Sequence, residues 1–135
     1  MSPLDLRPET RSALARGRLL YVAGRYFEAH EAWEEAWRVE TGQVRALLQG
    51  LIQVAAGFVK GLRDARPAGA VKLFESAEQR LSQFPEVFAG VALGPFRAEL
   101  ATATDAARRW RDGQARRLEA GAPRLDFISW PPNHA

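Results

Sequence analysis

The 135-residue sequence contains no cysteine, a single methionine and only two histidines. Without cysteine, disulfide bonds, thiolate metal sites and cysteine nucleophiles are all excluded. The longest apolar run, residues 46–59, is interrupted by two glutamines and is shorter than the roughly 20 residues needed to cross a bilayer. The N-terminal sequence MSPLDLRPETR lacks the apolar stretch of a signal peptide. We therefore expect a cytoplasmic protein.

The rest of the composition is that of an ordinary globular protein. Hydrophobic residues make up 47% of the chain and charged residues 26%, a balance that excludes a disordered chain. The length fits one domain, and we expect residues 1–135 to form it. Arginine supplies all but two of the nineteen basic side chains, the exceptions being Lys60 and Lys72. The formal net charge of +3 is compatible with an acidic partner without requiring one.

Hydrophobic residues recur with helical spacing along most of the chain, and strand patterns are nearly absent. Prolines that can open a helix and glycines that can end one mark the boundaries. The predicted helices cover residues 8–23, 27–39, 43–63, 67–84 and 95–120, followed by an extended C-terminal tail at 121–135. We expect residues 85–94 to form a loose segment with at most one helical turn. The short connections predict an all-α, compact bundle of about five helices built from antiparallel helical hairpins.

A small–aromatic–small pattern occurs twice in the predicted helices. Ala29, Trp33 and Ala36 have counterparts of the same kinds 41 positions later. The stretch GRYFEAHEAWEEA at 24–36 also resembles the second helix of a tetratricopeptide repeat, in which small residues let two helices approach closely. The spacing differs from the usual repeat length of about 34 residues, and no third copy follows. We therefore predict a tetratricopeptide-like pair of hairpins and not a repeat protein.

The segment YFEAHEAWEEAW, residues 26–37, places a histidine and four glutamates beside two tryptophans. On a helical wheel, the i, i+4 pair His30 and Glu34 flanks the apolar face, where the two side chains can contact each other and a neighbouring helix. The helix predicted at 43–63 carries two glutamines in an apolar run, and buried glutamines need hydrogen-bond partners. We expect His30 and Glu34 to supply them across the helix contact. The candidate site is thus a polar groove between the second and third helices, formed by His30, Glu31, Trp33, Glu34, Trp37, Gln49 and Gln53.

Two motifs resemble a known family. The stretch FEAHEAWEEAW at 27–37 matches the pattern aromatic-x-Ala-His-Glu-x-x-Glu-x-x-Trp, and QGLIQ at 49–53 is followed by small residues. With Gly69-Ala70 at the opening of the next helix, these motifs resemble the family known as domain of unknown function 309, over about residues 20–84. Its members are small all-helical bacterial and archaeal proteins. The resemblance implies a helical fold and a bacterial origin, and it implies no reaction because the family has no established activity.

A metal site is one interpretation of the His30 and Glu34 pair, because the i, i+4 spacing suits two ligands and Glu31 is adjacent. A metal normally takes three or more protein ligands, and the only other histidine, His134, is next to last in the chain. Glutamine is a poor ligand for transition metals. We therefore expect no metal and no other cofactor, and we expect the pair to belong to a structural hydrogen-bond network.

Two other functions stay open as alternatives. A small metal-dependent or hydrolase-like enzyme could use His30 and Glu34, because histidine is the usual proton donor and acceptor near neutral pH. No serine or threonine lies in a recognisable nucleophile motif, so the sequence identifies no catalytic residue. Six arginines within the predicted helix 95–120 suggest nucleic-acid binding. They do not share one face, so such binding should be weak and should disappear as salt is raised.

The tail carries four large apolar side chains, at Leu125, Phe127, Ile128 and Trp130, which would expose much apolar surface if they were free. We therefore expect residues 124–131 to be ordered, extended and packed against the bundle. In an extended chain the first two side chains share one face and the last two the other. Either a groove holds both faces, or a second protomer covers the outer one in a homodimer.

From these features we expect a binding or assembly module and not an enzyme. Its partner would be a protein or a small molecule that binds in the polar groove between the second and third helices. We expect no membrane partner. The identity of the ligand and the role of the arginine-rich C-terminal helix do not follow from the sequence.

Overall fold

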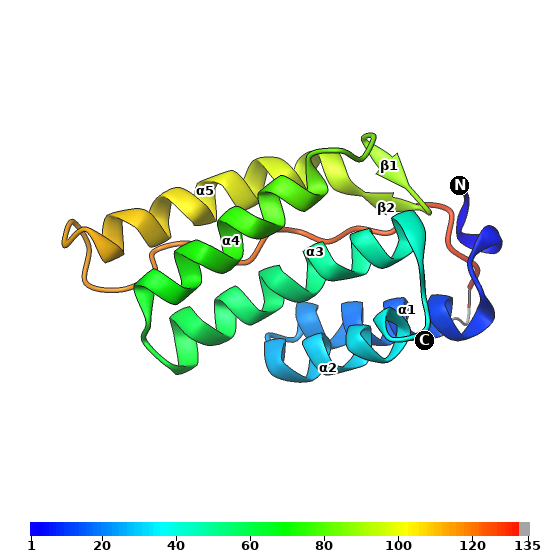
Figure 1. Cartoon of the computed structure of the whole chain (residues 1–135), viewed down its shortest axis with the longest axis horizontal. Coiled ribbons are helices and arrows are strands. Elements are labelled where there is room, and N and C mark those ends of the chain that lie inside the picture. Colours follow the sequence, from blue (N-terminus) through cyan, green and yellow to red (C-terminus); the bar gives the residue numbers. More distant parts are fainter. Residues whose placement is uncertain (133–135) are drawn as a thin grey trace.

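Five α-helices joined by short connections form the computed structural model of the chain, which describes residues 1–132 (Figure 1). The helices are α1 (Pro8–Val22), α2 (Tyr26–Trp37), α3 (Gly42–Phe58), α4 (Pro67–Leu81) and α5 (Leu93–Arg111). Each helix packs on the next one in the chain, and the predicted all-α bundle is confirmed. Within the described residues, no helix is both long enough and apolar enough to span a membrane. His134 lies outside the described residues.

The structure differs from the predicted elements at the end of α5 and in the segment before α5. Helix α5 ends at Arg111 and not near residue 120, because Gly113 takes a φ of +81° that turns the chain out of the helix. The segment expected to be loose forms an antiparallel hairpin of β1 (Val87–Phe88) and β2 (Val91–Ala92). Ala89 and Gly90 both have positive φ at its turn, the backbone that a tight hairpin requires. Strands of two residues are too short to show an alternating pattern in the sequence. A short 3-10 helix, η1 (Pro3–Asp5), also precedes α1.

Contact between a glycine and an aromatic ring organises the core in each helical hairpin. Trp33 of α2 is fully buried against Gly17 of α1, where an added methyl group would overlap the indole ring. Phe74 of α4 lies against Gly57 of α3 in the same way. The Trp33 indole N–H also donates to the carbonyl oxygen of Leu14, at 3.3 Å. The repeated sequence pattern therefore corresponds to two hairpins whose helices approach closely at a glycine.

We expect Gly57→Ala to lower the free energy of unfolding by about 1–2 kcal/mol. The added methyl group would overlap the Phe74 ring in a filled core, and this effect outweighs the gain of about 1 kcal/mol from replacing glycine in a helix. Gly121→Ala is the matched control, because no atom lies within 4 Å of a methyl group there and its φ is negative or extended. Urea titrations of both variants measure the difference. A Gly57→Ala chain as stable as the parent would contradict the close-approach argument.

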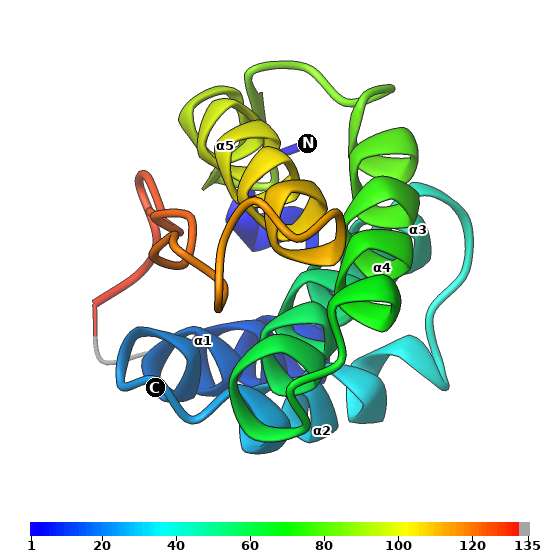
Figure 2. The same ribbon diagram turned by 90° about the vertical axis from the view of Figure 1, so that its left-hand side faces the viewer.

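The C-terminal segment runs along the seam between α1 and α5, on the side of the bundle away from α4 (Figure 2). On the α1 side, the Tyr21 hydroxyl donates to the carbonyl oxygen of Pro123 at 2.7 Å. Burial raises the pKa of this phenol, so it stays a neutral donor. On the α5 side, the backbone N–H of Arg124 donates to the Glu99 carboxylate at 2.7 Å. The tail thus links the first and last helices of a bundle whose most extensive helix contacts follow chain order.

The predicted ordered and extended tail is present, but its faces are not those predicted. Leu125 is only 2% exposed and joins the core, whereas Ile128 is 46% exposed. Ser129 has a φ of +58°, which interrupts the alternation and brings Trp130 onto Phe127 with ring centroids 4.3 Å apart. The prediction that Trp130 shares the outer face with Ile128 is therefore wrong. Ile128 remains largely exposed, and a second protomer as its cover stays a prediction.

Removal of the Leu125 side chain should lower the free energy of unfolding by about 2–5 kcal/mol, as for other buried leucines changed to alanine. Ile128→Ala should change it by at most about 0.5 kcal/mol, because that side chain is largely in solvent. Thermal melts of the two variants side by side provide the measurement. Similar melting temperatures for both would mean that the tail is not packed in solution.

Candidate functional site

The outer groove between α2 and α3 is bordered by partly exposed side chains at helical spacing. Helix α2 contributes Phe27, His30, Glu34 and Trp37, and α3 with its continuation contributes Ala46, Gln49, Ala56 and Lys60. A surface cleft that contains Phe27 and His30 lies at one end of the groove, and a cleft that contains Trp37 and Gln49 lies at the other. The groove is therefore not one continuous site but two ends separated by polar side chains.

His30 and Glu34 form the predicted contact on α2. The distance from the His30 Nε2 to the Glu34 Oε1 is 3.1 Å, and the two side chains are 24% and 31% exposed. The other ring nitrogen, Nδ1, is buried and has no hydrogen-bond partner within residues 1–132. One face of the imidazole packs toward the Phe27 ring, with centroids 5.7 Å apart. One ring nitrogen is thus buried and the other faces a carboxylate.

The predicted hydrogen bonds from this pair to the glutamines of α3 are not formed among the described residues. Gln53 instead donates from its Nε2 to the Ser76 hydroxyl oxygen of α4, at 2.9 Å. The Gln53 Oε1 is buried and has no hydrogen-bond partner among residues 1–132. Helix α3 packs between α2 and α4, and Gln53 faces α4. A helical wheel predicts which edge of α3 is polar, but it does not show which neighbouring helix that edge contacts.

The other four predicted residues lie in different places. Trp33 is fully buried between α1 and α2 and does not line the groove. Glu31 is exposed and lines none of four surface clefts of the molecule. Trp37 and Gln49 lie together at the far end of the groove. The seven predicted residues are therefore not gathered in one site.

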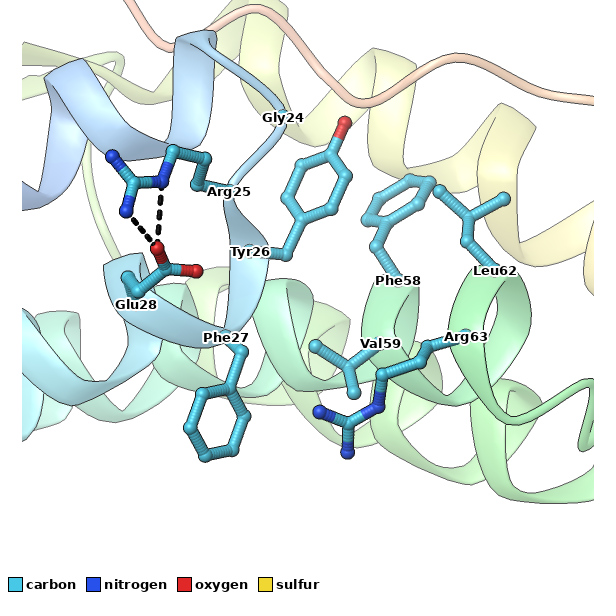
Figure 3. Close-up of a pocket in the computed structure, with 9 residues that line it drawn as sticks. All are labelled: Gly24, Arg25, Tyr26, Phe27, Glu28, Phe58, Val59, Leu62 and Arg63. Carbon is cyan, nitrogen blue, oxygen red and sulfur yellow. Dashed lines mark hydrogen bonds and ion pairs between the residues drawn. The ribbon is translucent and has the colours of Figure 1, made fainter.

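The largest of four surface clefts lies where the beginning of α2 meets the end of α3, and we call it the Tyr26 cleft (Figure 3). Besides this cleft and the two at the ends of the groove, a fourth is formed by the N-terminal residues and the start of α3 and contains Arg7 and Glu40. The Tyr26 cleft has a volume of about 560 Å³. Its lining residues are Gly24, Arg25, Tyr26, Phe27, Glu28, Phe58, Val59, Leu62 and Arg63. In Figure 3 the aromatic and aliphatic side chains face one another from the two helices, and the charged groups lie at the edges.

A π-helical turn forms one wall of the Tyr26 cleft. The last turns of α3 widen into η2 (Val59–Arg63), and the backbone N–H of Asp64 donates to the carbonyl of Val59, five residues earlier, at 3.1 Å. Gly61 within this turn leaves room for the Leu118 side chain, which would lie 2.9 Å from an added methyl group. Single π-turns inside helices are rare and occur frequently at functional sites. This turn carries Leu62 and Arg63 into the wall of the cleft.

Ion pairs hold the charged rim of the Tyr26 cleft. Arg25 donates from its Nε to the Glu28 carboxylate at 2.6 Å. Arg63 pairs with Asp64 at 3.1 Å, and its guanidinium carbon lies 5.2 Å from the centroid of the Phe27 ring. Burial raises the pKa of the Tyr26 phenol, so this lining side chain remains neutral. The cleft combines an apolar floor with two oriented cations.

A smaller neighbouring cleft of about 190 Å³, the His30 cleft, shares Phe27, Val59 and Arg63 with the Tyr26 cleft. It also contains Lys60 and Asp64, which are 3.9 Å apart. Across residues 1–132, no three or more histidine, cysteine, aspartate or glutamate side chains are grouped so that they could hold a metal ion.

Sequence reasoning missed most of the residues that line the Tyr26 cleft. Of the residues in its lining, the defined positions of the family motifs include only Phe27, and the predicted site residues include none. The stretch FVKGLR at 58–63 carries one signal for an apolar surface at the end of the third predicted helix. It contains Phe58, Val59 and Leu62 and is followed by a helix break at Pro67. The close approach of this stretch to Tyr26 is a tertiary contact, with the Phe58 and Tyr26 rings 5.3 Å apart.

Comparison with known proteins supports the resemblance predicted from the two motifs. Residues 14–73 match the family described as "Domain of unknown function (DUF309)". No curated protein gives a significant match. The matched segment contains every residue that lines the Tyr26 and His30 clefts. The match identifies an uncharacterised domain and assigns no activity.

Replacement of Gln53 tests whether the glutamines stabilise the fold. Gln53→Leu removes a buried oxygen that has no partner, which offsets the loss of the bond to Ser76. We expect its free energy of unfolding to equal that of the parent chain or to exceed it by up to about 1 kcal/mol. The double variant Gln53→Leu/Ser76→Ala removes both partners and should be at least as stable. A loss of more than about 1 kcal/mol in urea titrations of both variants would restore the polar network as a stabilising feature.

Proposed function

We propose that this chain, whose residues 14–73 match an uncharacterised family, is a binding module that holds its ligand at the Tyr26 end of the α2–α3 groove. The ligand class that fits is an amphipathic molecule with an apolar or aromatic body and one negatively charged end. The proposed ligand site lies in the same groove that the sequence predicts. It occupies one end of that groove, and its lining side chains differ from the seven predicted ones.

The apolar floor of the Tyr26 cleft is the observation that carries the proposal. Phe27 and Leu62 remain 43% and 58% exposed although they face a concave surface that also contains Tyr26, Phe58 and Val59. Apolar surface in such a cleft gains about 25 cal/mol for each Å² that a ligand covers. The volume of about 560 Å³ falls within the range of about 300–1,000 Å³ that is usual for small-molecule sites.

The charged rim supports a preference for a negative end on the ligand. Arg25 and Arg63 lie at the edges of the cleft, and each is oriented by a carboxylate next to it. An arginine that is already oriented loses less conformational freedom when it binds an anion. Because each cation is partly neutralised, the apolar floor supplies most of the affinity and the rim supplies orientation.

The position of His30 favours binding over acid–base chemistry. A general base must reach its substrate within hydrogen-bond distance. The His30 Nε2 faces Glu34 at 3.1 Å, and the Nδ1 is buried. Neither nitrogen is directed into the Tyr26 cleft, whose lining does not include His30. The pair therefore supports the wall of the groove in this proposal and does not act on the ligand.

The aromatic sulfonate dye 8-anilinonaphthalene-1-sulfonate has the shape and charge that this cleft should accept. We expect Leu62→Asp to weaken dye binding about tenfold, because the change removes apolar contact and adds a like charge beside the sulfonate. Fluorescence titration of the folded chain measures the dissociation constant.

Leu19→Asp is the matched control, since Leu19 is 55% exposed and Leu62 is 58% exposed, and Leu19 lines none of the four clefts. Its dye affinity should stay within about twofold of the parent value. The dye also binds partly unfolded states, so both variants must be shown to keep the native fold. We expect their near-ultraviolet circular dichroism spectra to equal that of the parent chain. Equal weakening by the two changes, or no weakening by either, would refute the proposal.

A further inference from the structure

The cleft at the opposite end of the groove, which we call the Trp37 cleft, has a different charge pattern. It is lined by Trp37, Gly42, Arg45, Ala46, Gln49 and Arg80, and so contains two cations and no carboxylate. In the three other clefts, cations pair with carboxylates that line the same cleft. These pairs are Arg25 with Glu28, Lys60 with Asp64, and Arg7 with Glu40. The positive charge of the Trp37 cleft is not neutralised in this way.

The two guanidinium groups of the Trp37 cleft are free of acidic partners. Within residues 1–132, neither Arg45 nor Arg80 forms a hydrogen bond or an ion pair through its side chain. They come from different helices, α3 and α4, and meet at one concave surface. Two like charges that share a cleft repel each other, and an anion bound between them would relieve that repulsion.

Contacts within the cleft restrain one of these cations. The guanidinium carbon of Arg45 lies 4.0 Å from the centroid of the Trp37 ring, a cation–π contact that limits the freedom of a long side chain. Gln49 is one helical turn beyond Arg45 on α3 and adds an amide N–H donor to the same surface. The cleft therefore offers donors from three side chains on two helices, beside an aromatic wall from a third.

We propose that the Trp37 cleft binds the phosphate group of a small phosphate monoester. Two arginines match the double negative charge of such a group, and each planar guanidinium can bind two of its oxygens. The volume of about 320 Å³ is at the lower end of the range for small-molecule sites, and it leaves room for the group that the phosphate esterifies. The Trp37 cleft shares no lining residue with the Tyr26 cleft, so this site does not depend on the function proposed there.

Calorimetric titration of the full chain with phenyl phosphate at low ionic strength tests the proposal. We expect saturable binding, accompanied by backbone amide shifts in nuclear magnetic resonance spectra that are centred on Trp37 and Gly42–Gln49. Arg80→Ala should weaken binding by about ten- to hundredfold, the usual effect of deleting a charged hydrogen-bond donor. Arg80 is exposed, and among residues 1–132 its side chain forms no hydrogen bond or ion pair, so thermal melts should be unchanged.

Arg109→Ala is the matched control, because it removes the same charge from an exposed arginine of α5 that lines none of the four clefts. Its affinity for phenyl phosphate should stay within about twofold of the parent value. Equal losses in both variants would mean that binding follows net charge, which would overturn the assigned site. Inorganic phosphate and benzoate are the comparison ligands. Tighter binding of either one than of phenyl phosphate would overturn the monoester assignment, and so would the absence of any binding.

Discussion

Two close contacts, Gly17 with Trp33 and Gly57 with Phe74, hold the helices of each hairpin together. Each contact places a large ring where a side chain on the facing helix would otherwise lie, so the helices approach closely and the ring is fully buried. The contact between Gly17 and Trp33 sets the orientation of α2. With Trp33 directed into the core, the edge of α2 that carries Phe27 and Trp37 lies at the surface beside α3. The candidate clefts therefore depend on the packing of the core beneath them.

Many arginines of this chain serve the fold, which bears on the meaning of its basic composition. Arg18 donates to the carbonyl oxygen of Leu125 in the tail at 2.6 Å. Arg97 donates to the carbonyl oxygen of Leu81, the last residue of α4, and to that of Phe84 beyond it. Arg108 pairs with Glu75 across the contact between α4 and α5. These bonds use the several donors of the guanidinium to satisfy carbonyl and carboxylate groups at the edges of helices. Among residues 1–132, basic side chains without a hydrogen bond or an ion pair are the minority, and of the four clefts only the Trp37 cleft contains two of them.

The two ends of the α2–α3 groove offer different chemistry at separated places. Phe27 and Trp37 are ten residues apart on α2, which corresponds to about 15 Å along the helix axis. In both places an arginine from the neighbouring helix lies over the aromatic ring, Arg63 at one end and Arg45 at the other. At the first end the arginine is paired and the floor is apolar, whereas at the second it is unpaired and the lining is cationic. The two proposals would therefore place ligands of different character on one side of the bundle.

The sequence by itself determined the five helices, most of their boundaries and the buried face of each. These features depend on spacing along the chain and on local backbone preferences at residues such as Pro8 and Pro67. It also placed His30 beside Glu34, because a helix fixes the distance between residues four apart. The tertiary structure alone decided that Gln53 bonds Ser76, that Ser129 turns Trp130 inward, and where the clefts lie. Those outcomes require contacts between residues far apart in the chain, and periodicity specifies the face of a helix but not the neighbour that this face meets.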